Sequence, residues 1–155
     1  AATRRNGASV YVDYAHTPEA IEVALKSLKP HILGKLIVII GAGGERDEGK
    51  RPLMGLAAEK NSDFVIITDD NPRNEDPQLI HQMIKNGIKD KNKVMVIGDR
   101  AEAILKAVDL LGVGDCLLIA GKGHETEQFI GENIFPFDDF EQASLSVSSL
   151  DGIER

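Results

Sequence analysis

Three polar strings of this chain carry residue types that could recognise a zwitterionic amino acid. Residues 70–73 are Asp-Asn-Pro-Arg, residues 41–47 are Gly-Ala-Gly-Gly-Glu-Arg-Asp, and residues 121–125 are Gly-Lys-Gly-His-Glu. Arginine binds carboxylates through paired hydrogen bonds, and glutamate carries the charge that attracts an ammonium group. The glycines leave the backbone free to approach a ligand. Together the strings predict a binding pocket for an amino acid.

Each string follows an apolar run that is typical of a strand. Strands are expected at residues 9–14, 35–40, 63–68, 93–97 and 115–120. The second, third and fifth of these runs are almost continuously apolar, which suits parallel strands buried on both faces. The carboxyl ends of parallel strands meet at one edge of the sheet, where open α/β folds bind ligands. We therefore expect the three strings to converge there.

Helix patterns fill the gaps between the strands. A capping residue followed by proline occurs at residues 17–18 and 76–77, and further helices are expected to begin near residues 51, 99 and 138. A short hairpin is expected within residues 126–137. The alternation predicts one three-layer, Rossmann-like α/β domain over residues 1–155, with a mostly parallel sheet of about six strands and one antiparallel edge strand. Residues 1–8 are expected to be a loose linker end.

Composition narrows the class of protein. A chain of 155 residues fits a single core, and a net charge of −7 argues against nucleic-acid binding. No apolar run reaches the ~20 residues of a membrane span. Cys116 is the only cysteine, which rules out a disulfide within the chain and a cysteine-rich metal site, and favours a reducing, cytoplasmic location. The chain begins with Ala1 rather than methionine, so we expect it to be part of a longer protein.

Each string also has a simpler interpretation. The glycine run fails as a dinucleotide fingerprint because Arg46 occupies the position of the last glycine, and it could be only a tight turn. Asp70, Asn71 and Pro72 are residue types common in turns, and His124 could be a structural histidine. Residues 13–18 run from a strand into a helix, where Asp13 and His16 could meet a phosphate or ribose or could belong to an ordinary capped start.

Taken together, the strings resemble the C-terminal domain of the Mur ligases, the ATP-dependent enzymes that build the peptidoglycan stem peptide. Residues 12–18, 43–47, 70–73 and 121–125 match that family's signatures in order, and Gly98-Asp99-Arg100 also fits. The resemblance covers residues 8–150. It is strongest to the UDP-N-acetylmuramoyl-tripeptide synthetases, in which the Asp-Asn-Pro-Arg string marks enzymes that add meso-diaminopimelate rather than lysine.

The resemblance implies a set of residues that bind the diamino acid. Arg73 and Asn71 would hold its distal carboxylate, and Asp70 and Pro72 belong to the same string. Arg46 would hold the carboxylate beside the attacking amine. The distal ammonium group would be bound by Glu125 and by the carbonyl of Gly121.

The resemblance also implies contacts with ATP through Asp13, Tyr14 and His16, and no metal ligand in this chain. The family transfers a phosphoryl group from ATP, with Mg²⁺, to the UDP-muramoyl dipeptide, and the amine then attacks the acyl phosphate. The UDP-binding N-terminal domain and the central ATPase domain show no signature here. We therefore expect a cytoplasmic, monomeric enzyme of which this chain, inactive alone, is one domain.

Other classes of protein remain open at the level of sequence. A related Mur-type ligase could use lysine, glutamate or another amino acid, and Arg73 is the residue that would discriminate. A magnesium-binding receiver module could use Asp69, Asp70 and Lys122, although it needs an acidic pair where only Asp13 is found. A stand-alone nucleotide-binding domain is disfavoured by the broken glycine fingerprint.

Overall fold

A six-stranded, mostly parallel sheet forms the centre of the described chain, which comprises residues 2–4, 6–44 and 47–153 of a computed structural model. The strands lie in the order β1-β2-β6-β3-β4-β5, and β1 alone of these runs antiparallel to its neighbour. Their bounds are β1 (Ala2–Thr3), β2 (Ser9–Asp13), β3 (Leu36–Ile40), β4 (Phe64–Ile67), β5 (Val94–Val96) and β6 (Cys116–Ala120). The predicted α/β class, the strand number and the single antiparallel edge are confirmed.

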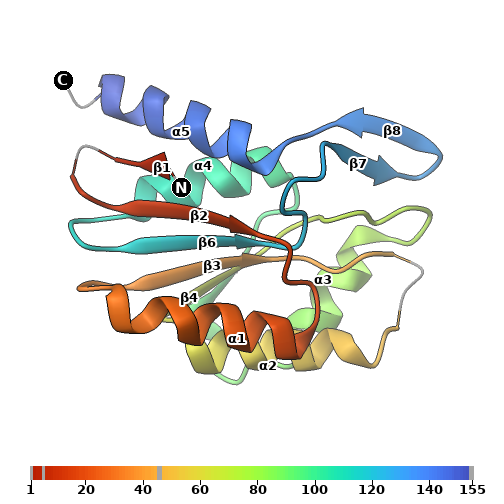
Figure 1. The fold of residues 1–155 in the computed structure, drawn as a ribbon. Helices are drawn as coiled ribbons and strands as arrows, with labels where there is room; N and C mark the ends of the chain where they lie inside the picture. Colours follow the sequence, from red (N-terminus) through yellow and green to blue (C-terminus); the bar gives the residue numbers. More distant parts are fainter. Residues whose placement is uncertain (1, 5, 45–46, 154–155) are drawn as a thin grey trace.

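Helices cover both faces of this sheet (Figure 1). One face packs against α1 (Pro18–Leu28), α2 (Lys50–Asn61) and α3 (Pro77–Lys85), and the other against α4 (Arg100–Leu110) and α5 (Asp139–Ile153). Every residue of β3 and β6 is buried, as their apolar sequences require of strands covered on both sides. Short 3₁₀ turns occur at Lys29–His31 and Lys91–Lys93. No helix in the described ranges has the length and apolarity to cross a bilayer.

The starts of α1, α3 and α4 follow from local chemistry. The Thr17 hydroxyl accepts a hydrogen bond from the Ala20 amide, and the Asp76 carboxylate accepts one from the Gln78 amide. In both cases proline takes the first helical position, where its missing N–H is not needed. Asp99 caps α4 through the Glu102 amide.

The order of the strands creates a switch point at one edge of the sheet. β6 lies between β2 and β3, although it comes last of the three in the chain. The loop after β3 leads to α2 on one face, whereas the chain after β6 leads to the hairpin of β7 (Glu127–Ile130) and β8 (Asn133–Pro136) and then to α5 on the other face. Two neighbouring loops that diverge in this way leave a crevice, the usual ligand position in such folds.

The beginning of the chain differs from the expectation of a loose end over residues 1–8. Ala2 and Thr3 pair with Val10 and Ser9 of β2. Arg4 and Ala8 are buried, with 3% and 0% of their surface exposed. A two-residue strand is too short to leave a periodic pattern in the sequence, so only the packing reveals it.

Candidate functional site

A cavity of about 390 Å³ opens at the carboxyl ends of β2, β3, β4 and β6. Loops that are far apart in the sequence form its wall, which is the convergence expected from the three strings. From the sequence-predicted set, its lining includes Tyr14, His16, Asp70, Asn71, Arg73, Gly121 and Glu125. The cavity therefore occupies the switch point of the sheet, between the loops that follow β3 and β6.

The loop of residues 70–73 packs directly on the glycine run after β3. The Gly44 amide donates to the Asn71 carbonyl at 2.7 Å, and a Cβ on Gly44 would lie 1.8 Å from the Pro72 carbonyl oxygen. Only glycine fits this approach. Arg73 closes the contact, because its Nη1 donates to the carbonyls of Gly44 and Asn71, both at 3.3 Å. Pro72 thus shapes the wall, although it does not line the cavity.

Arg73 adopts a backbone conformation that non-glycine residues rarely adopt, with φ at +54°. Its amide donates to the Phe129 carbonyl at 3.1 Å, and its Cζ lies 5.8 Å from the centre of the Phe129 ring. The Asn71 side-chain oxygen accepts from the Phe129 amide at 3.0 Å. In the described part of the chain, no carboxylate forms an ion pair with Arg73.

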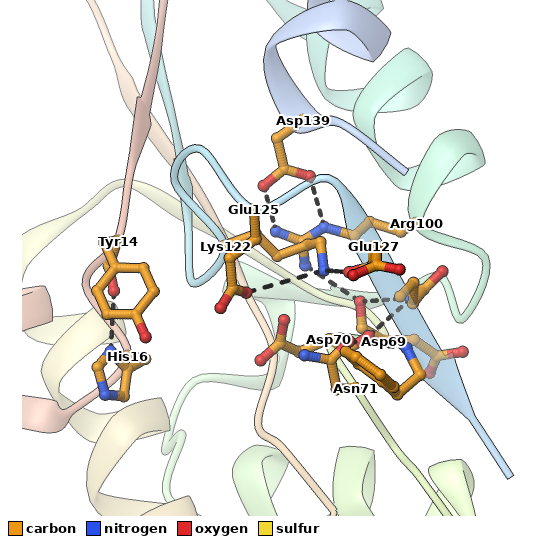
Figure 2. Close-up of polar contacts among 12 residues, drawn as sticks. Tyr14, His16, Asp69, Asp70, Asn71, Arg100, Lys122, Glu125, Glu127 and Asp139 are labelled. Atoms are coloured by element: carbon orange, nitrogen blue, oxygen red, sulfur yellow. Dashed lines mark hydrogen bonds and ion pairs between the residues drawn. The ribbon is translucent and has the colours of Figure 1, made fainter. Parts of the chain in front are cut away.

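Asp70 lies at the floor of the cavity with 8% of its surface exposed. Its Oδ1 has no hydrogen-bond partner among the described residues. Near it, the fully buried Lys122 donates through Nζ to the Glu127 carbonyl and lies 4.0 Å from Glu125 Oε1 (Figure 2). Burial lowers the pKa of Lys122, and the Asp70 carboxylate partly opposes that shift.

Arg100 links the segment that follows β4 to the end of β6 (Figure 2). Its guanidinium pairs with both oxygens of Asp139 and also donates to the carbonyls of Asp69 at 3.1 Å and Ala120 at 3.2 Å. Burial disfavours its charge, but the Asp139 carboxylate holds the pKa of Arg100 above its ordinary value. The sequence placed Arg100 at a helix start and did not indicate this contact.

Arg51 is a second supporting residue that sequence reasoning missed. It lines the cavity, is 1% exposed, and pairs with both oxygens of Glu75. Its Nη2 also donates to the Gly43 carbonyl at 3.1 Å. The pair therefore ties α2 to the glycine run and to the segment after residues 70–73. A spacing of 24 residues between the partners leaves no local signal in the sequence.

The residues expected to meet ATP form the side of the site nearest α1. Tyr14 and His16 line the cavity, with their ring centres 4.7 Å apart, and His16 Nδ1 lies 2.9 Å from the Tyr14 carbonyl oxygen. Asp13 does not line the cavity; its carboxylate accepts from the Ala15 amide, while its carbonyl accepts from the Gly121 amide. All three residues are exposed to solvent.

Two remaining expectations have different outcomes. Arg46 lies outside the described residues. His124 is exposed, so it is not a buried structural histidine. Within the described ranges, no group of histidine, cysteine and acidic side chains is arranged to hold a metal ion.

Comparison with known proteins places this geometry in a family. The family model described as "Mur ligase, glutamate ligase domain" matches residues 2–123. A protein of Bradyrhizobium diazoefficiens, named UDP-N-acetylmuramoyl-L-alanyl-D-glutamate--2,6-diaminopimelate ligase, is 51% identical over 145 residues, which are 94% of this chain and 29% of that protein. A protein of the same name from Coxiella burnetii is 54% identical over 138 residues, which are 89% and 28%. The chain thus spans less than a third of these relatives.

Solved structures agree with the sequence matches. A UDP-N-acetylmuramoyl-L-alanyl-D-glutamate--2,6-diaminopimelate ligase superposes with a TM-score of 0.88 at 43% identity, over 91% of this chain and 29% of that one. A domain ascribed to a UDP-N-acetylmuramate ligase of Haemophilus ducreyi gives a TM-score of 0.60 at 14% identity, over 94% and 93%. The second likeness shows the fold alone. These matches set aside the receiver and the stand-alone nucleotide-binding module.

Proposed function

The chain belongs to the Mur ligase family, and from this premise we propose that it is the amino-acid-binding C-terminal domain of a ligase that joins 2,6-diaminopimelate to UDP-N-acetylmuramoyl-L-alanyl-D-glutamate. In the proposed reaction, the γ-phosphoryl group of ATP passes to the terminal carboxylate of the UDP-linked dipeptide. The amine of diaminopimelate attacks the acyl phosphate, its carbonyl–oxygen bond breaks, and phosphate leaves. The amine loses a proton as the amide forms.

The observation that carries the proposal is the placement of Arg73. Three chain segments fix its guanidinium at the cavity wall, yet no described carboxylate pairs with it. A carboxylate of the ligand would supply that partner through charge-assisted hydrogen bonds. Asn71, which lines the same wall, would lie beside the carboxylate.

The distal ammonium group, which is on the same carbon as this carboxylate, would be bound by acidic and carbonyl groups. Glu125 and Gly121 line the same cavity as Asp70, Asn71 and Arg73, and the buried Asp70 Oδ1 adds an acceptor that has no partner among the described residues. These groups suit an ammonium group. Arg46 would hold the carboxylate beside the attacking amine, in the role that the family resemblance gives it.

This arrangement favours diaminopimelate over lysine. Lysine carries both amino groups of diaminopimelate, but it lacks the second carboxylate that Arg73 would bind. Sites built around a buried polar partner can reject an analogue that lacks it by ~10⁴-fold. Selectivity would then reside in this domain, whatever the remainder of the enzyme contributes.

Tyr14 and His16 are proposed to contact ATP when the central domain of the same protein closes on this edge of the sheet. Asp13 would support them through its links to Ala15 and Gly121. We assign no described residue to the Mg²⁺ that would accompany ATP, because these side chains form no metal-binding cluster. Since ATP and UDP-linked precursors are made inside the cell, the proposal places a monomeric enzyme in the cytoplasm.

The test uses the full-length ligase that contains this chain. Phosphate release is measured with ATP, the UDP-linked dipeptide and either meso-diaminopimelate or lysine, for wild type, Arg73→Ala and the exposed control Lys106→Ala. We expect wild type and the control to prefer diaminopimelate strongly, and Arg73→Ala to lose that preference. Equal use of lysine by wild type would refute the proposed specificity. No release with either amino acid would refute the ligase assignment for this chain.

A further inference from the structure

The hairpin of β7 and β8 is not part of the six-stranded sheet, and it packs instead against the loop of residues 70–73. The Arg73 amide donates to the Phe129 carbonyl at 3.1 Å, and the Gly131 amide donates back to the Arg73 carbonyl. Arg73 and Ile130 form a parallel β-bridge. The backbone of β7 therefore pairs with the loop as a short additional strand.

Two side chain contacts strengthen this pairing. Gln128 is 7% exposed, and its Nε2 donates to the Asp70 carbonyl at 2.8 Å. The Phe129 ring lies 5.8 Å from the Arg73 guanidinium carbon, within the range of a cation–π interaction. In consequence, β7 contacts the loop at Asp70, Asn71 and Arg73, the three of its four residues that line the cavity.

These contacts explain how Arg73 keeps its strained backbone conformation. A positive φ in a residue other than glycine persists only where the surrounding structure enforces it. Hydrogen bonds with Phe129 of β7 and with Gly131, the residue after β7, fix the backbone on both sides of the Arg73 α-carbon, and the ring of Phe129 contacts the guanidinium. If β7 were displaced, Arg73 could relax to an ordinary conformation and its guanidinium would leave the cavity wall.

The hairpin also falls outside residues 2–123, the range that the shared family model matches. The β7–β8 hairpin, which supports the loop of residues 70–73, is thus separate from the part of the domain that the family model describes. Such a supporting element can differ between ligases while the sheet and its strand-end loops keep their arrangement.

We propose that Gln128 and Phe129 are specificity-determining positioning residues, which hold Arg73 in the geometry that recognises the second carboxylate of the amino-acid substrate. The inference rests on the proposed function, because it concerns the selectivity of that same cavity. Neither side chain is expected to touch the substrate. Both act by keeping the guanidinium of Arg73 and the carbonyl of Asp70 in place.

The experiment compares Phe129→Leu and Gln128→Ala with two reference variants in the full-length ligase. Phe129→Tyr keeps the aromatic ring, and Phe135→Leu makes the same change at a half-exposed position on β8. We expect Phe129→Leu and Gln128→Ala each to raise the KM for meso-diaminopimelate about fivefold, which corresponds to ~1 kcal/mol. The KM values for ATP and the UDP-linked dipeptide should stay unchanged, and both reference variants should resemble wild type.

A second measurement separates this inference from the proposed function. Hydrogen exchange of the peptide over residues 70–76, followed by mass spectrometry, should be faster in Phe129→Leu and Gln128→Ala than in Phe135→Leu. If wild type used lysine as well as diaminopimelate, the proposed specificity would fail. This measurement would still show whether Gln128 and Phe129 hold the loop that contains Arg73 in place. Unchanged exchange, or a rise in all KM values together with a fall in kcat, would overturn the inference.

Discussion

Arg100 and Asp139 form a completely buried, bidentate ion pair, with 2.7 Å from Nε to Oδ1 and 2.6 Å from Nη2 to Oδ2. Arg100 also donates to the carbonyls of Ala120, the last residue of β6, and of Asp69, two residues after β4. The pair therefore fixes the start of α5 to the two strands whose loops carry Asp70 and Gly121. Good geometry and full hydrogen bonding are what offset the cost of burying both charges.

Removal of one member of this pair should be more harmful than removal of both. Arg100→Met leaves the Asp139 carboxylate buried without a partner and should lower the free energy of unfolding by about 3–5 kcal/mol. The double variant Arg100→Met with Asp139→Leu should recover much of that loss. Urea denaturation of the 155-residue chain measures both, with the exposed Lys106→Met on the same helix as control. A double variant as unstable as the sum of the two single ones would contradict this account.

Gly44→Ala should disrupt the contact between the glycine run and residues 70–73. The added Cβ would lie 1.8 Å from the Pro72 carbonyl, so backbone must move. We expect a loss of about 1–3 kcal/mol in the free energy of unfolding and a higher KM for diaminopimelate. Gly152→Ala, which meets open space near the end of α5, is the matched control and should be neutral or slightly stabilising. Similar behaviour of the two variants would show that the tight contact is unimportant.

Arg73→Gly and Arg73→Ala should separate the effect of backbone strain at this position from the role of the side chain in substrate binding. Both variants lose the guanidinium and should lose the preference for diaminopimelate. Only glycine adopts a φ of +54° without penalty, so Arg73→Gly should be more stable than Arg73→Ala by about 1 kcal/mol. Thermal unfolding of the two variants side by side measures the difference. Equal stabilities would mean that the position relaxes once the side chain is removed.

Glu59 should make the stability of the chain sensitive to acid. Burial opposes its charge, but the amides of Asp90 at 2.7 Å and Lys89 at 3.1 Å outweigh that effect and hold the pKa of Glu59 below its ordinary value of 4.5. A lowered pKa in the folded state contributes stability that is complete above pH 4.5 and is lost as pH falls through the lowered pKa.

Glu59→Gln tests this linkage, because the amide keeps the shape but loses one acceptor. At pH 7 the variant should be less stable than wild type by about 1–2 kcal/mol, and the difference should shrink as the pH falls below 4.5. Unfolding curves between pH 3 and 7, in steps of roughly one unit across the range where carboxyl groups titrate, would show the trend. Glu19→Gln, at an exposed position on α1, serves as the control. A difference that is constant with pH would exclude Glu59 as its source.

Much of the site was predictable because its residues follow apolar strands directly. β3, β4 and β6 have the continuous apolar sequences of covered parallel strands, and parallel strands deliver their following loops to one edge. That logic was enough to bring Asn71, Arg73 and Gly121 together. The wrong expectation for residues 1–8 arose where pairing is only two residues long and leaves no period to detect.

The supporting contacts could not be predicted, since their partners are distant in the sequence and polar. Arg100 and Asp139 are 39 residues apart, and nothing local in the sequence distinguishes them from exposed charges. The hairpin was expected, but its pairing with Arg73 depends on a positive φ, which arginine seldom adopts. Sequence patterns report burial and local geometry, whereas these contacts depend on where whole elements dock.

The position of β6 has a consequence for the order of folding during synthesis. Its residues 116–120 insert between β2 and β3, which leave the ribosome much earlier and cannot pair with each other in the native sheet. Until β6 is available, both strands expose an unpaired, apolar edge of the kind that invites association with other chains. The central strand thus arrives after its neighbours, which makes this topology rich in non-local contacts and slow to fold. A nascent chain that ends before residue 116 should need a chaperone, and the binding cavity forms only once that last parallel strand is in place.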